Sequence, residues 1–143
     1  MAEIVKDQVF GEMEYKHRWV KKELITLLGN DNNVSIVAAA YTGDSIIDNQ
    51  REAYKYFKQH INEINNELPH IIKKYVECHK DEIEEHYKLE SVDKAIHLVK
   101  PTSILFTRDG KAIIMCNVAW DEENGIGIEV FPKFEIDLQD AYI

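Results

Sequence analysis

Hydrophobic and polar positions change their spacing twice along this chain, from alternation to a helical period and back to alternation. Near the start, uncharged side chains alternate with four charged residues and then Val20, which predicts a half-buried strand over residues 12–20. The alternating positions are Met13, Tyr15, His17 and Trp19. Two apolar runs, 24–28 and 34–41, then flank an Asn-Asp-Asn-Asn tetrad. Together they predict a hairpin whose turn is residues 30–33.

The middle of the chain has helical spacing. Asn49 and Glu52 have the spacing of a capping box, with Asp48 as a competing cap. Apolar residues then step by four, four, three and four and define one helix face: Ala53, Phe57, Ile61, Ile64 and Leu68. Because Pro69 lacks a backbone N–H, the pattern predicts a break near residues 66–69. A second helix follows it, and residues 81–89 continue it or form a third.

Alternation returns after residue 101. A β-branched run, 102–107, is joined by Asp109 and Gly110, a typical hairpin turn, to a second run over 111–118. Residues 126–131 and 134–138 predict two further strands. We therefore predict an α+β fold: a largely antiparallel sheet with two or three central helices packed on one face. The prediction is a single domain over 1–143, with strands about 9–41, helices about 48–89 and strands about 102–138.

Charge restricts the class of partner. Seventeen Lys and Arg residues against 26 Asp and Glu leave a net charge of −9, which repels phosphate backbones and argues against nucleic-acid binding. From Trp120 to the end of the chain there are seven acids and one base. The charge of this part is therefore −6, whereas residues 1–30 carry five acids and five bases. This acidic region is a solvated surface that maintains solubility, or a patch that attracts a basic partner.

We expect neither a secretion signal nor a membrane-spanning segment in this sequence. The first thirty residues contain no seven-residue apolar stretch, and the longest apolar runs are far too short to span a bilayer. Cys78 and Cys116 are the only cysteines and form no CxxC pair. We expect a cytoplasmic protein with two structural thiols and no cofactor.

The most unusual segment is the Trp120–Gly125 loop between two predicted strands. It places an indole, three carboxylates and an amide within a few residues: Trp120, Asp121, Glu122, Glu123 and Asn124. As a structural loop, Trp120 would fill the core, Gly125 would supply a positive-φ turn and Gly127 would permit close backbone approach or a bulge. Alternatively, Asp121 to Asn124 would contact a partner. An EF-hand is excluded, because the position that needs glycine is Ile126.

Other candidate sites are weaker. His79, Glu82 and His86 lie near one helix face and are weak metal-ligand candidates, but further ligands are not evident in the sequence. No serine lies in a Gly-x-Ser-x-Gly elbow, and no phosphate-binding glycine loop is present. The strand face that carries His17 and Trp19 has two interpretations. It is part of the core, with one hydrogen-bonded histidine, or, if it is exposed, it is an aromatic binding surface. We predict no catalytic residues.

Two stretches resemble a group of small bacterial domains of unknown function. Residues 49–57 resemble their Q-x-x-A-x-x-x-F helix start, and residues 120–128 resemble a W-D-x-E-H-G-h-x-h pattern near their C-termini. Asn124 stands where that pattern often has histidine. Such domains often occur in genomic company with toxin and immunity genes, which implies an interaction module such as an immunity protein.

The first functional hypothesis is a protein-binding module, of immunity type on the resemblance, whose acidic C-terminal surface meets a basic protein. The alternative is a small metal-dependent hydrolase that uses carboxylates of the Trp120–Gly125 loop and a histidine from the helices. A cavity that joins the two would support it. A third hypothesis, an architectural domain, predicts a large apolar patch without a pocket.

Overall fold

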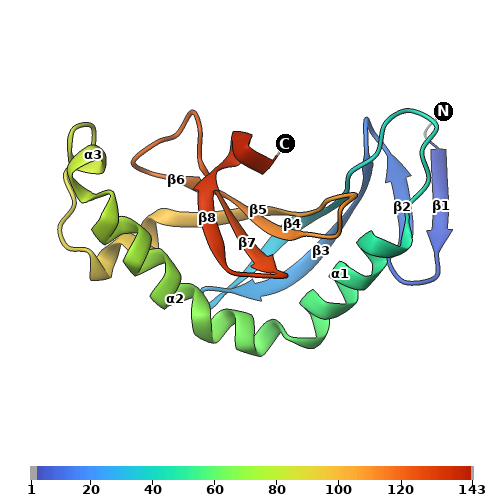
Figure 1. Ribbon diagram of the computed structural model, residues 1–143, viewed down its shortest axis with the longest axis horizontal. Coiled ribbons are helices and arrows are strands. Elements are labelled where there is room, and N and C mark those ends of the chain that lie inside the picture. Colours follow the sequence, from blue (N-terminus) through green and yellow to red (C-terminus); the bar gives the residue numbers. More distant parts are fainter. Residues whose placement is uncertain (1–2, 143) are drawn as a thin grey trace.

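An eight-stranded mixed sheet forms most of the structure, a computed structural model that describes residues 3–142 (Figure 1). Its strands lie side by side in chain order: β1 (Glu3–Asp7), β2 (Gly11–Tyr15), β3 (Trp19–Leu27), β4 (Asn30–Ala38), β5 (Val99–Phe106), β6 (Ala112–Val118), β7 (Ile126–Phe131) and β8 (Glu135–Leu138). Neighbouring strands are antiparallel except β4 and β5, which are parallel.

The helical segment connects the two parallel strands, because a parallel pair needs a long crossover. It contains α1 (Asp48–Gln59), α2 (Ile61–Cys78), the short α3 (Lys80–Glu84) and a 3-10 helix, η1 (Asp93–Leu98). A second 3-10 turn, η2 (Gln139–Tyr142), follows β8. In Figure 1, α1 and α2 run one after the other along the same side of the sheet. None of the helices within residues 3–142 has the length and apolar character needed to cross a membrane.

The predicted fold class is wrong. Strand residues make up 38% of the structure and helical residues 32%, so the sheet dominates and the helices are mostly short. The sheet is mixed because its two halves join through the parallel β4–β5 pair. Local patterns could not predict this contact, because strands separated by about sixty residues leave no trace of their pairing in either sequence. Strand β1 was also missed, since three of its five residues are charged.

The predicted apolar helix face is buried against the sheet. The side chains of Ala53, Phe57, Ile64 and Leu68 are buried in the main core, and Ile61 is half-buried at its edge. This core also contains Phe10 and Phe106, whose rings pack around Tyr54. The four-four-three-four spacing therefore identified the contact face of α1 and α2 correctly.

The helix break lies elsewhere than predicted. Pro69 lies inside α2, and the chain breaks at His60 between α1 and α2. His60 leaves helical geometry, with φ −108° and ψ 21°, and its Nδ1 lies 3.0 Å from the Tyr56 carbonyl oxygen. Its ring also stacks on the Tyr56 ring. The break therefore lies at a residue whose imidazole contacts the preceding turn, and no proline is involved.

The first strands also differ from the prediction. Residues 12–20 form two strands, β2 and β3, joined by a tight turn in which His17 has φ 67° and is exposed. His17 is therefore not a core histidine. The next turn is Leu28 and Gly29, both with positive φ, whereas the polar tetrad 30–33 is part of β4. A two-residue loop with two positive φ angles matches the right-handed twist of the flanking strands. This geometry favours a turn at Leu28 and Gly29 over a turn at residues 30–33.

The other face of the sheet has a smaller apolar cluster. Val37, Leu105, Ile113 and Met115 are buried there, and Tyr142 of η2 packs against them. The predicted hairpin at Asp109 and Gly110 joins β5 to β6, and Gly110 has φ 89°. The sheet is therefore covered by helices on one face and in part by the C-terminal turn on the other.

Candidate functional site

The Trp120–Gly125 loop connects β6 to β7 and is fixed by its own hydrogen bonds. The Asp121 carboxylate accepts from the backbone N–H of Asn124 at 3.2 Å and from its side-chain amide at 3.1 Å. The backbone N–H of Gly125 donates to the Asp121 carbonyl oxygen at 3.0 Å. Trp120 is 8% exposed and packs in the main core. The loop therefore holds its own shape and is anchored by the indole.

Both glycines of this segment make room for the C-terminal turn. Gly125 has φ 61°, and a Cβ there would lie 2.5 Å from Nε2 of Gln139. A Cβ at Gly127 would lie 2.5 Å from the ring of Tyr142. The positive-φ turn predicted at Gly125 is observed, whereas Gly127 is approached by the side-chain ring of Tyr142 and not by a backbone segment or a bulge.

The polar residues of the loop point into solvent to different degrees. Asp121 is half-buried, whereas Glu122, Glu123 and Asn124 are exposed. Glu129, counted with the acidic C-terminal region, is completely buried. The acidic surface of the C-terminal region is thus smaller than the sequence indicates, because Glu129 does not contribute to it.

The histidine cluster lies at the end of α2 and in α3. His79 forms the junction of the two helices, its Nδ1 lies 2.9 Å from the Tyr75 carbonyl oxygen, and its ring stacks on that of Tyr75. This contact leaves Nε2 as the ring nitrogen available for other partners. Glu82 and His86 are exposed on the following turn.

A cavity of about 710 Å³ joins this cluster to the Trp120 loop. Its volume is in the range of small-molecule binding sites. It is lined by Tyr75, His79, Glu82, Ile83, Glu85 and His86 from the helical side, by residues 119–124 of the loop, and by Leu138 of β8. In Figure 1, α3 faces the β6–β7 connection at one end of the molecule, and most of the residues that line the cavity belong to these segments and to the end of α2.

The cavity has a negative electrostatic character. Five of its lining residues are carboxylates, and no Lys or Arg lines it within residues 3–142. Burial raises the pKa of the Tyr75 phenol, and the negative charges of Asp137, Glu82 and Asp121 raise it further. Those carboxylates belong to β8, α3 and the loop, so three elements impose a negative potential on one aromatic ring.

The residues do not form a metal center. In the described part of the chain, no group of three or more His, Cys, Asp or Glu side chains is arranged to hold a metal ion. His79, Glu82 and His86 line the same cavity as the loop acids. These side chains are nevertheless not arranged with the distances and directions that metal ligands need. Cys78 and Cys116 are both free thiols, exposed and buried respectively.

Sequence reasoning identified both halves of the cavity and considered a contact between them only under the hydrolase hypothesis. It missed Tyr75, Ile83, Glu85 and Leu138. Tyr75 could have been found, because Tyr75, His79, Glu82 and His86 follow one another at steps of four, three and four along a helix. Leu138 gave no such signal, because it belongs to a separate strand.

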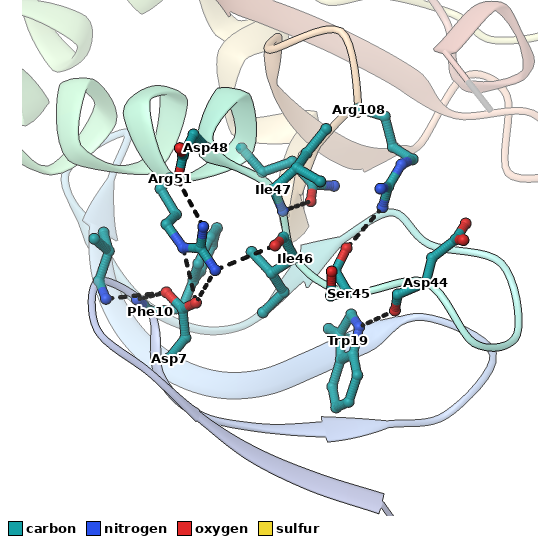
Figure 2. A network of polar contacts seen from close by, with 12 residues as sticks. Asp7, Phe10, Trp19, Asp44, Ser45, Ile46, Ile47, Asp48, Arg51 and Arg108 are labelled. Carbon is teal, nitrogen blue, oxygen red and sulfur yellow. Dashed lines mark hydrogen bonds and ion pairs between the residues drawn. The ribbon is translucent and has the colours of Figure 1, made fainter.

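A second polar network lies at the start of α1 (Figure 2). Arg51 donates to the buried carboxylate of Asp7 at 2.9 Å, to Asp48 at 2.7 Å and to the Ile46 carbonyl oxygen at 3.1 Å. Asp7 also accepts from the backbone N–H groups of the β1–β2 turn, at Val9 and Phe10. These groups satisfy one another within the chain, so the network joins the first hairpin to α1 and is a structural feature.

Comparison with known proteins gives a family without an assigned activity. A family model described as "Domain of unknown function (DUF6985)" matches residues 9–132, which is most of the chain. No curated protein matches the sequence. No solved structure matches it either.

Proposed function

The chain belongs to the DUF6985 family, and we propose that it is a cytoplasmic protein-binding module whose acidic cavity receives a basic side chain of a protein partner. The observation that carries the proposal is the composition of the cavity. Five carboxylates surround two aromatic residues, Tyr75 and Trp120, with no cationic side chain among the described lining residues. Such a site attracts a cation and disfavours nucleic acid.

A lysine or arginine fits this chemistry better than an inorganic ion. Its charged end would contact the carboxylates of Asp121, Glu122 and Glu82, and its apolar stem would pack against Ile83 and Leu138. Tyr75 adds a ring face on which a guanidinium can stack. The site therefore combines charge attraction with apolar contact, which is the combination that a protein segment offers.

The resemblance to bacterial domains found near toxin genes gives this proposal a specific form. In that form the partner is a basic toxin, and the chain is its immunity protein. An immunity protein needs complementary charge and shape and no catalytic groups, which agrees with a preformed acidic cavity and an intact loop.

A first experiment compares two peptides and two variants. The probe is a synthetic arginine–glycine peptide, and the control peptide has glutamate in place of arginine. We expect the arginine peptide to bind the wild-type protein. The triple variant D121N/E122Q/E123Q, which neutralises the three loop acids, should bind it about tenfold more weakly. Calorimetric titration at about 0.05 M and about 0.3 M salt measures both the affinity and its salt dependence, which should flatten in the triple variant.

The matched control neutralises three exposed acids outside the cavity, with E12Q, E63Q and E67Q. It changes the net charge by the same amount, so it should retain nearly the wild-type affinity. Equal weakening in both triple variants would mean that only net charge matters. No binding of the arginine peptide by the wild-type protein would also contradict the proposal.

A metal-dependent hydrolase is the second candidate, and one observation favours it. The cavity places Asp121 and Glu123 in the same space as His79 and His86. Thermal melts with calcium, magnesium, manganese and zinc separate the two functions, because a bound ion stabilises the folded state. We expect no shift in melting temperature. A shift in the wild-type protein that is lost in the D121N/E122Q/E123Q variant would favour the hydrolase.

A further inference from the structure

The C-terminal turn η2 is seated on the sheet through the two glycines of the Trp120 segment. Gln139 donates its side-chain amide to the Cys116 carbonyl oxygen at 2.7 Å, in the space that a Cβ at Gly125 would occupy. The ring of Tyr142 occupies the corresponding space over Gly127. Both contacts require that residues 125 and 127 lack a side chain. These two glycines therefore define the position of η2 on this face of the sheet, which we call its seat.

A buried carboxyl group lies next to this seat. Glu129 of β7 lies two residues after Gly127, pairs across the sheet with Ile113, and its side chain has no exposed surface. Among residues 3–142, neither of its carboxyl oxygens has a hydrogen-bond partner. The nearest cation is Lys111, whose Nζ lies 3.9 Å away and whose side chain is 38% exposed. This pair is too long for a hydrogen bond.

An ionised carboxylate is unstable in such a position. Burying a charge without hydrogen bonds is strongly unfavourable, whereas a neutral carboxylic acid is tolerated. Burial raises the pKa of Glu129. The positive charges of Lys111 and Lys133 oppose this shift, whereas the negative charges of Glu135 and Asp109 add to it. From η2 itself, the facing titratable group is Tyr142, whose phenol has a pKa raised by burial and by the charge of Glu129.

We propose that η2 is a proton-dependent latch, seated on Gly125 and Gly127 while Glu129 is protonated and released when Glu129 loses its proton to solvent. Release admits water to the carboxylate and returns it to its ordinary solvation. The latch directly follows the wall of the acidic cavity, because Leu138, the last residue of β8, lines that cavity and precedes Gln139. Release of η2 would therefore change the shape of the cavity, which goes beyond the binding function proposed above.

The sign of the pH dependence follows from linkage. The pKa of Glu129 is higher with η2 seated than with η2 released, so seating is complete in acid, below the released-state pKa. Seating weakens as the pH rises through the seated-state pKa. Each unit of difference between the two pKa values changes the seating equilibrium by up to about tenfold.

Hydrogen exchange of the purified protein tests the latch without any ligand. The measured quantity is the protection of amides in residues 135–142, relative to intrinsic exchange, from about pH 5 to about pH 8.5. We expect protection to fall with rising pH in the wild-type protein and to stay high in Glu129→Gln, which cannot ionise. Constant protection in the wild-type protein, or the same fall in Glu129→Gln, would overturn the proposal.

Two further variants test the seat and the charge separately. Gly127→Ala should release η2 at every pH, while amides of β3 and β4 stay protected and show that the fold is intact. Lys111→Gln removes the nearest cation, so release should move to higher pH. Retained protection in Gly127→Ala, or a move to lower pH in Lys111→Gln, would contradict the latch. Because no ligand is present, such a result leaves the proposed binding function unaffected.

Discussion

Replacing Phe57 with alanine is expected to lower the free energy of unfolding by about 3–5 kcal/mol, the usual cost of deleting a core phenylalanine. Phe57 has no exposed surface, and its ring meets Phe106 of β5 edge-on at a centroid distance of 6.1 Å. The substitution removes one of the two α1 rings that pack against Phe106 in the sheet. The cavity left behind cannot close easily, because the neighbouring aromatic rings are held by strands.

Urea unfolding followed by circular dichroism measures this effect. Tyr41→Ala is the matched control, since Tyr41 is an aromatic residue that is 82% exposed. It should change the stability by no more than about 0.5 kcal/mol. A loss below about 1 kcal/mol for Phe57→Ala, or equal losses in both variants, would mean that α1 does not pack as the structure has it.

Patterns that act over a few residues predicted structure well. The apolar spacing of α1 and α2 identified their buried face, because a helix fixes the direction of each side chain. Asp109 and Gly110 identified the β5–β6 hairpin, and Trp120 is buried at the end of β6 as predicted. In each case the chemistry that decides the structure lies within a single element or turn.

Features decided by distant contacts were not predictable. Leu28 is a poor turn residue by composition, yet the β3–β4 hairpin places it at φ 54°, because the strand pairing on both sides favours a two-residue loop. The parallel contact of β4 with β5 made the predicted fold class wrong, as no local pattern encodes which strands become neighbours.

The candidate site shows the same division. The loop acids and the α2–α3 histidines were each identified from the sequence, about thirty-five residues apart, but their common cavity exists only because η1 and β5 return the chain to β6. Glu129 shows the converse. Its charge and its place in the acidic C-terminal region indicated an exposed side chain, whereas its position in the central part of β7 buries it completely.

Replacing Asp7 with alanine is expected to lower the free energy of unfolding by about 3 kcal/mol at neutral pH, because it leaves Arg51 without its buried partner. The Asp7 side chain is 3% exposed and lies 2.8 Å from the Arg51 guanidinium, and its second oxygen accepts from Val9 and Phe10 (Figure 2). Asp48→Ala is the matched control. Asp48 also pairs with Arg51, but it is 86% exposed, so its loss should cost only about 0.5–1 kcal/mol.

The pH dependence of this effect has a definite sign. Burial alone would raise the pKa of Asp7, but the hydrogen bonds from Arg51, Phe10 and Val9 outweigh it and lower the pKa below the ordinary value of 3.8. A lowered folded-state pKa means that the carboxylate stabilises the protein fully above the ordinary value and that this stabilisation is lost as the pH falls through the folded-state value. The difference between wild type and Asp7→Ala in urea unfolding should therefore be constant from about pH 8 to about pH 5 and narrow toward about pH 3. If the difference in unfolding free energy between wild type and Asp7→Ala stays unchanged in acid, Asp7 acts through packing and not through its charge. If Asp48→Ala loses as much stability as Asp7→Ala, the stabilising contact lies at the surface of α1.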